Sequence, residues 1–259
     1  MGFFENISRL EHELIIEAEL SHGDYFLYLQ EISEYFGDYF LKEDNFFNNV
    51  EEVYNFKVLY MKLDKMLKLA GLSIIRLHMN QAYMDLRNAL ELGCLAAYSL
   101  VFPETEFVFS NQKSNIDELQ KDRQYKEKKL KEKVYKWLAE SFPEHSKVIK
   151  HNKDLINQNV AHGNAFDAHS LIEKLDDNQF IFSFHDRYHP KYIRKTMWII
   201  SNTMFTFMHL FYNAAVSNKL IIKNNEIEIK LTAFLQTDMK IRSEIKNMFI
   251  SDDESQLRV

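Results

Sequence analysis

Hydrophobic residues recur at intervals of three and four along most of the chain, which is the spacing of an amphipathic helix. This pattern predicts helices over residues 6–20, 24–41, 48–70, 73–102, 117–140, 146–161, 191–217 and 226–250. Only 6 glycines and 3 prolines are present, and their scarcity favours helices over a β-sandwich. We therefore expect an all-α protein that folds as an antiparallel helical bundle.

The chain divides into three expected parts. Residues 1–47 are expected to form an N-terminal helical extension, residues 48–250 the bundle, and residues 251–259 a frayed acidic tail. One segment departs from helical spacing, because Asp176-Asp177-Asn178 is typical of a turn and the run from Phe180 to Phe184 is typical of a strand. A small β-hairpin is expected near residues 171–185.

The helix expected over residues 73–102 carries two lines of different chemistry. One line is apolar and rich in small residues that let another helix approach closely: Ile75, Met79, Ala82, Leu86, Ala89, Gly93, Ala96 and Leu100. The other line is polar: Arg76, Asn80, Arg87 and Glu91. Arg87 and Glu91 stand one turn apart, so their pairing is expected to fix a guanidinium at mid-helix, although a solvated ion pair without function has the same spacing. The preceding Gly71-Leu72-Ser73 predicts a tight turn, which makes this helix the second arm of a hairpin.

The helix expected over residues 191–217 is the most apolar of the chain. No residue from Thr196 to Asn218 is charged, so a membrane span has to be considered. A polar seam at helical spacing argues instead for a central helix buried among others. The seam consists of Asn202, Thr206, His209 and Asn213. Buried amides need partners, because each unpaired one costs about 1–3 kcal/mol.

A candidate site combines this seam with the end of the helix over residues 146–161. His162 falls at the last position of that helix, before Gly163, where the helix dipole favours a protonated imidazole. Asn159 shares a face with His162. The expected catalytic residues are Arg87, His162 and Asn159, and the expected binding residues are Glu91, Asn202, His209 and Asn213. A capping histidine and a hydrogen-bonded core network without chemistry explain the same residues.

The helix expected over residues 117–140 is rich in lysine, with acidic residues interspersed. Two interpretations are open: a basic ridge that contacts phosphate, or a solvated helix stabilised by short-range ion pairs. Only its end carries enough apolar surface to dock, through Val134, Trp137 and Leu138.

Overall composition limits the classes of function. The net charge of −6 and the pI of about 5.9 argue against broad binding to nucleic acid by charge alone. The single cysteine, Cys94, stands in an apolar stretch, so it is expected in the core, and a reducing cytoplasm is favoured. The histidines between His145 and His189 match no standard ligand spacing, so no metal and no cofactor are expected.

The run Leu86-Arg87-Asn88-Ala89-Leu90-Glu91, followed by Ala97-Tyr98, and the later Asn159-Val160-Ala161-His162-Gly163 resemble the HEPN-like helical superfamily, in particular its uncharacterised bacterial branches. The resemblance covers roughly residues 48–217. It implies a helical bundle that often dimerises, with members that cut RNA in toxin and phage-defence systems and others that only bind. This sequence departs from the nuclease members, because no arginine is followed by a histidine four to six residues later. A site must therefore combine Arg87 and His162 from two helices.

Two functions follow from these observations. The first is a metal-independent endoribonuclease of a toxin or phage-defence system, in which Arg87 steadies the scissile phosphate and His162 moves a proton. The second is a non-catalytic helical module that binds protein or RNA. The expected partners are a second copy of the chain, RNA, and an antitoxin or another protein; no membrane is expected.

Overall fold

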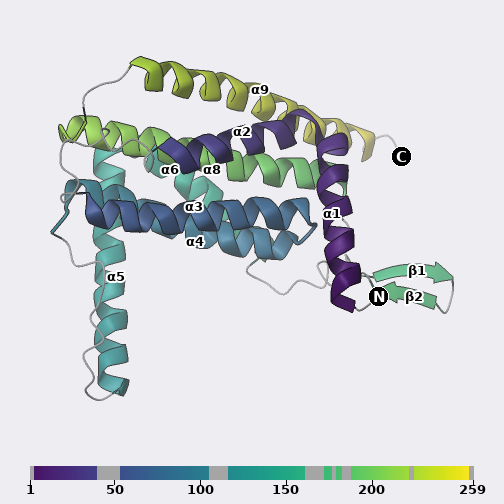
Figure 1. The fold of residues 1–259 in the computed structure, drawn as a ribbon, viewed down its shortest axis with the longest axis horizontal. Coiled ribbons are helices and arrows are strands. Elements are labelled where there is room, and N and C mark those ends of the chain that lie inside the picture. Colours follow the sequence, from purple (N-terminus) through teal and green to yellow (C-terminus); the bar gives the residue numbers. More distant parts are fainter. Residues whose placement is uncertain are drawn as a thin grey trace.

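The computed structural model describes residues 3–39, 53–104, 116–160, 172–176, 179–182, 188–221 and 225–256. Within these ranges the chain folds as a helical bundle, which confirms the prediction of an all-α protein (Figure 1). The described helices are α1 (Phe3–His22), α2 (Asp24–Tyr39), α3 (Tyr54–Ile75), α4 (Met79–Val101), α5 (Ile116–Ser141), α6 (Pro143–Val160), α8 (Pro190–Ser217) and α9 (Asn225–Gln256). Residues 251–256, expected in the tail, belong to α9.

Two short strands are also described. β1 (Ile172–Asp176) and β2 (Gln179–Phe182) pair in an antiparallel ladder, with Ile172 opposite Phe182 and a register shift between Lys174 and Asp176. Figure 1 draws this pair at the edge of the molecule, away from the long helices.

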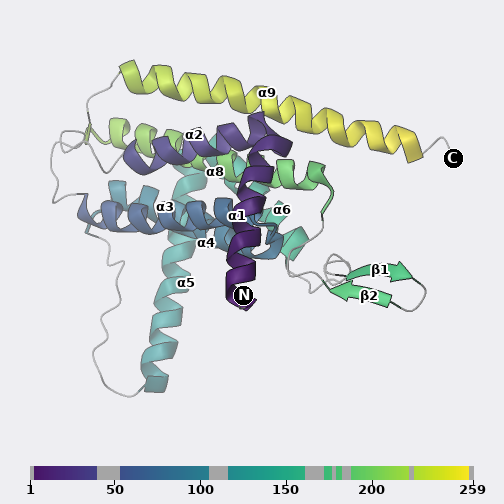
Figure 2. The ribbon, with the colours of Figure 1, turned by 45° about the vertical axis from the view of Figure 1, so that its right-hand side comes forward.

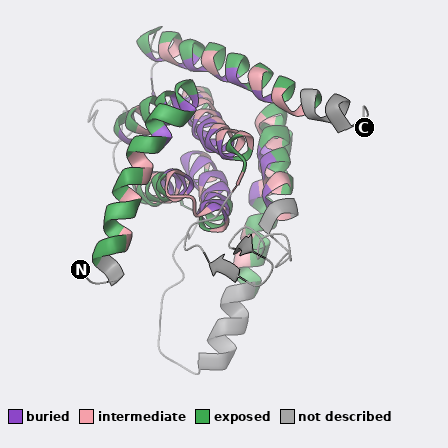
Figure 3. Cartoon of the chain, turned by 90° about the vertical axis from the view of Figure 1, so that its right-hand side faces the viewer, coloured by how far each residue is buried: buried purple, intermediate pink, exposed green. Residues whose placement is uncertain are grey.

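Helix α8 is the central element, as its uncharged sequence predicted. It packs against α2, α3, α4, α6 and α9, and most of its residues are buried, while one side that includes Asn202 and His209 is partly buried (Figure 3). In the described part of the chain no helix has the length and apolar character of a membrane span. Helix α9 runs alongside α8 and α2 in two views of the molecule (Figures 1 and 2).

Aromatic side chains from α2, α3 and α8 fill the core. Phe36 of α2 stacks on Tyr60 of α3 with 4.9 Å between ring centroids, and Phe56 meets Phe211 of α8 edge to face at 5.2 Å. Phe36, Phe56 and Tyr60 are fully buried, so these pairs add to the stability that burial provides. Helix α2, which lies in the expected N-terminal extension, thus packs within the bundle.

The turn between α3 and α4 lies later than the sequence indicated. The Gly71-Leu72-Ser73 turn is wrong, because all three residues belong to α3, and the helix predicted from residue 73 begins at Met79. The chain instead reverses at Arg76-Leu77-His78, with Leu77 in the left-handed region at φ 58°. Gly71 faces α2, where a Cβ atom would lie 3.7 Å from Leu29, an ordinary packing distance.

Helices α4 and α8 cross in close contact at Gly93. A Cβ atom at this position would lie 2.2 Å from Cζ of Phe207, whose side chain is fully buried. Glycine is therefore required here by the approach of the two helices, because its own backbone is helical. Gly93 of the predicted small-residue line thus faces α8, as does Met79, whereas Ile75 belongs to α3.

Helix α5 docks through its C-terminal part, as predicted. Val134 and Leu138 are buried, and Trp137 meets Tyr98 of α4 edge to face at 5.4 Å. Phe142, which separates α5 from α6, packs on the same indole at 5.5 Å. These aromatic contacts place α5 and α6 together against α4.

Candidate functional site

The residues predicted to form one site lie in three places. Arg87 and Glu91 of α4 face α5 and α6, Asn202 of α8 lies in a polar network with α6 and α9, and His209 and Asn213 line a hollow between α8 and α9. Asn159 belongs to the last turn of α6, but its side chain lies outside the described part of the structure. His162 lies outside the described residues as well.

Glu91 pairs with a residue of α5 and not with Arg87. Its Oε2 lies 2.7 Å from Nζ of Lys131, while the Arg87 side chain is exposed. The expected Arg87–Glu91 pair is therefore wrong. Helix α5 packs against α4 and places the Lys131 ammonium on the Glu91 carboxylate. Arg87 makes no ion pair with any residue in the described ranges, so its guanidinium can meet a ligand.

Tyr135 of α5 lies among these charges. Nζ of Lys153, on α6, donates to its phenol oxygen over 3.4 Å and lies 4.9 Å from the ring centroid. Burial raises the pKa of Tyr135, Cys94 and Glu91 raise it further, and Arg87 lowers it. Lys153 contacts this phenol, Arg87 acts on it through its charge, and Lys131, bound to Glu91, stands one turn before Tyr135 on α5. We call these three cations the basic cluster.

Asn202 joins three helices through its amide. Its Nδ2 donates to Oδ1 and Oδ2 of Asp238 on α9 over 3.2 and 3.1 Å, and its Oδ1 accepts from Asn152 of α6 over 3.4 Å. Nε1 of Trp198 donates to the same carboxylate over 2.9 Å. Burial raises the pKa of Asp238, although the hydrogen bonds from Asn202 and Trp198 act in the opposite direction. Because its donors and acceptor are engaged, Asn202 has a structural role.

His209 and Asn213 contact each other and a histidine of α6. Nδ1 of His209 lies 3.1 Å from Nε2 of His145, and Nε2 of His209 lies 3.3 Å from Nδ2 of Asn213. If the amide donates to His209, that imidazole carries its proton on Nδ1 and donates to His145. Burial lowers the pKa of both histidines, to about 4 for His145, where His209 contributes as well. The pair is therefore neutral at neutral pH.

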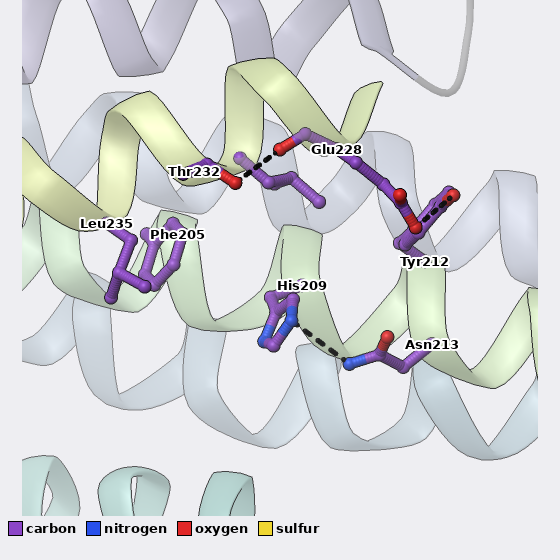
Figure 4. Close-up of a pocket in the computed structure, with 8 residues that line it drawn as sticks. Phe205, His209, Tyr212, Asn213, Glu228, Thr232 and Leu235 are labelled. Carbon is purple, nitrogen blue, oxygen red and sulfur yellow. Dashed lines mark hydrogen bonds between the residues drawn. The ribbon is translucent and has the colours of Figure 1, made fainter. Parts of the chain in front are cut away.

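A hollow of about 320 Å³ lies between α8 and α9 beside this pair (Figure 4). His209, Asn213, Phe205 and residues of α9 line it, and Glu228 accepts a hydrogen bond from Tyr212 over 3.3 Å at one side. No lysine or arginine lines it among the described residues. An anionic ligand such as RNA phosphate would meet a carboxylate and no cation there, so the hollow does not suit phosphate.

The histidine pair predicts a dependence of stability on pH. Since the folded-state pKa of each imidazole lies below the value of 6.5 for an exposed histidine, the unfolded chain binds more protons below that pH. The stability that the neutral histidine pair contributes to the folded state is complete above pH 6.5 and is lost as the pH falls towards 4. Thermal unfolding followed between pH 7.5 and about 5 measures this loss of stability.

Replacement of one imidazole supplies the comparison. His145→Gln is expected to flatten the decline in Tm between pH 7 and about 5, whereas His151→Gln, at an exposed position on the same helix, keeps the wild-type slope. Equal slopes in the two variants would show that the buried pair does not control this range.

Cys94 is buried in the core, as predicted. Its thiol is 1% exposed, and burial raises its pKa to about 12, so the thiolate that a nucleophile needs does not form near neutral pH. Within the described ranges, no three residues among the histidines, cysteines, aspartates and glutamates come together as metal ligands would.

Several residues of these groups were missed from sequence. Asp238 and Asn152 each interrupt an apolar line, since Phe234 and Ile241 flank one at helical spacing and Ile149 and Ile156 flank the other. A polar residue on a buried face needs a partner, and that rule could have identified both. Tyr135, in contrast, gave no signal, because its partners lie on α4 and α6.

Comparisons with protein-family models, curated proteins and solved structures found no match to this chain.

Proposed function

We propose that this protein acts on RNA, as a metal-independent endoribonuclease whose phosphate-binding face is the basic cluster on α4, α5 and α6. The observation that carries the proposal is the set of cations around Tyr135 and Glu91: Lys153 contacts the Tyr135 phenol, Arg87 lowers its pKa, and Lys131 binds Glu91. The HEPN-like resemblance supports the same residues, since Arg87 and His162 belong to the two sequence segments that carry it.

The exposed guanidinium of Arg87 suits a phosphodiester. A guanidinium presents parallel N–H donors that match two phosphate oxygens, and a lysine supplies a compact positive charge. Lys153 lies over one face of the half-buried Tyr135 ring, and the opposite face of that ring is where a base can stack. The acidic chain as a whole repels nucleic acid, so binding depends on this local face.

Cleavage needs no metal in this scheme. His162 removes the proton from the ribose 2′-hydroxyl, and the 2′-oxygen then attacks the adjacent phosphorus. Arg87 stabilises the negative charge that develops on the phosphate oxygens, and Asn159 orients the imidazole or the ribose. The bond to the 5′-oxygen breaks, water protonates that oxygen, and the products are a 2′,3′-cyclic phosphate and a 5′-hydroxyl. In toxin or phage-defence systems, an antitoxin would be the protein partner.

Incubation of the purified protein with end-labelled RNA in the presence of EDTA tests the proposal. We expect cleavage by the wild-type chain, loss of cleavage in His162→Ala and Arg87→Ala, and weaker RNA binding in Lys153→Ala. A substrate with one 2′-deoxynucleotide is expected to resist cleavage at that position, because the attacking hydroxyl is absent.

Exposed residues of the same type serve as controls. His151→Ala and Arg242→Ala remove an exposed imidazole and an exposed guanidinium outside the basic cluster and are expected to retain activity. If His162→Ala and Arg87→Ala both cleave RNA as strongly as the wild-type chain does, or if RNA is cleaved at a 2′-deoxynucleotide, this assignment of the site is refuted.

A second candidate function is a helical module that binds RNA or protein without cleaving it. It is favoured by the internal engagement of four of the predicted site residues: Glu91 with Lys131, Asn202 with Asp238, and His209 with Asn213 and His145. Fluorescence anisotropy with a labelled RNA that remains intact would support this module, provided that Arg87→Ala and Lys153→Ala weaken the binding.

A further inference from the structure

Helix α1 has little contact with the rest of the molecule. Of its residues from Glu5 onward, only Ala18 and His22 are buried, and Figure 3 shows exposed positions along most of the helix. Ile16 and Leu20 are 50% and 81% exposed. Because most of the stability of a helix in a protein comes from packing of its apolar face, such a face normally packs against another element. The attachment to the bundle includes Glu11, which pairs with Arg76 and His78 beside the α3–α4 turn.

The outer face of α3 is also uncovered and apolar. Val58, Met61 and Leu72 lie on one side of this helix and are between 40% and 58% exposed. Met61 follows Val58 by three residues and Leu72 follows Met61 by eleven, about three turns, so the three lie on the same side of the helix, with Lys65 and Leu69 between Met61 and Leu72 on that side. Exposed apolar residues that gather on one side of a helix mark an interaction site more often than scattered single residues do.

The two faces carry opposite charge. Helix α1 contains five glutamates and one arginine, and Glu13 and Glu17 flank Ile16 and Leu20. Helix α3 contains four lysines and one aspartate; the exposed Lys62 lies beside Val58 and Met61, and the exposed Lys65 lies one turn after Met61. Lys62 and Lys65 make no ion pair with any residue in the described ranges. Each face therefore has the chemistry that the other needs.

We propose that a second copy of this chain covers both faces, so that α1 of each protomer lies on α3 of its partner. A second copy supplies an α3 for the first copy's α1 and an α1 for the first copy's α3. Because both pairs of faces are covered, the arrangement is a closed two-fold dimer. Within one chain, Glu11 of α1 pairs with Arg76 beside the α3–α4 turn, while Val58, Met61 and Lys62, earlier in α3, are exposed and can meet the partner. This inference is independent of any action on RNA.

Charge reversal tests the dimer. Light scattering after gel filtration is expected to give twice the chain mass for the wild-type protein at micromolar concentration. Glu13→Lys with Glu17→Lys, and separately Lys62→Glu with Lys65→Glu, place like charges across the interface and are expected to weaken dimerisation about 100-fold. A mixture of the two monomeric variants is expected to form a mixed dimer, because each α1 then meets an α3 of opposite charge.

Lys150→Glu with Lys246→Glu makes the same change of charge at exposed positions on α6 and α9 and is expected to leave the dimer intact. Circular dichroism of every variant checks that the helices remain folded. A monomeric wild-type chain, or a dimer that both reversals leave unchanged, overturns the proposal. Two monomeric variants that fail to associate when mixed overturn the pairing of α1 with α3.

Discussion

Gly93→Ala is expected to lower the free energy of unfolding by about 3 kcal/mol, the upper part of the range for overpacked cores. Alanine alone would favour the helix by about 1 kcal/mol, so the sign is decided by the contact with α8. The new Cβ would lie 2.2 Å from Cζ of Phe207, which is fully buried and cannot turn into solvent. The two helices must therefore separate. Chemical denaturation followed by circular dichroism measures the loss.

A second glycine provides the matched control. Gly71→Ala also adds a methyl group inside a helix, but the new atom would meet Leu29 at 3.7 Å, so no loss of stability is expected. Reducing the opposing ring in the double variant Gly93→Ala with Phe207→Leu is expected to recover part of the stability. A Gly93→Ala protein as stable as Gly71→Ala would mean that α4 and α8 do not pack this closely.

Asp238→Ala is expected to have the second large effect, a loss of about 3 kcal/mol. The side chain is 5% exposed, and its removal leaves the Trp198 indole N–H and the Asn202 amide without an acceptor. Each buried donor left unpaired costs about 1–3 kcal/mol. Denaturation monitored by tryptophan fluorescence reports both the stability and the altered surroundings of Trp198.

The contribution of charge can be separated from that of hydrogen bonding. Asp238→Asn keeps one acceptor oxygen and is expected to lose less stability than Asp238→Ala, while Asp154→Ala, at an exposed position, is expected to change little. If Asp238→Ala matched Asp154→Ala, the network between α6, α8 and α9 would contribute nothing measurable.

The positions of most helices could be predicted because the apolar period and the burial agree. The break between α1 and α2 at Gly23, with φ of 45°, followed from local sequence, as did the beginning of α8 at Pro190. The α3–α4 turn did not, because a leucine in the left-handed region has no sequence signature, and Gly71 has the composition of a turn while it serves packing.

The candidate site was harder to predict than the fold, because partners of long side chains depend on which helices cross. Glu91 had a cation one turn away in sequence, yet the cation that reaches it is Lys131 of α5, forty positions later. The polar seam of α8 did find polar partners, as buried amides require, but these were Asp238 and His145 and not Arg87. Local spacing therefore gave Glu91 the wrong partner, while the Asn159 side chain and His162 lie outside the described residues.

The central place of α8 has a consequence for the order in which the protein is assembled during synthesis. The apolar faces of α2, α3, α4 and α6 meet on a helix that begins only at Pro190. A nascent chain that ends before this residue contains these four helices without their common partner. Their apolar faces therefore stay exposed to other chains and to chaperones until α8 leaves the ribosome. The core is therefore completed late in synthesis, when α8 becomes available to the helices made before it.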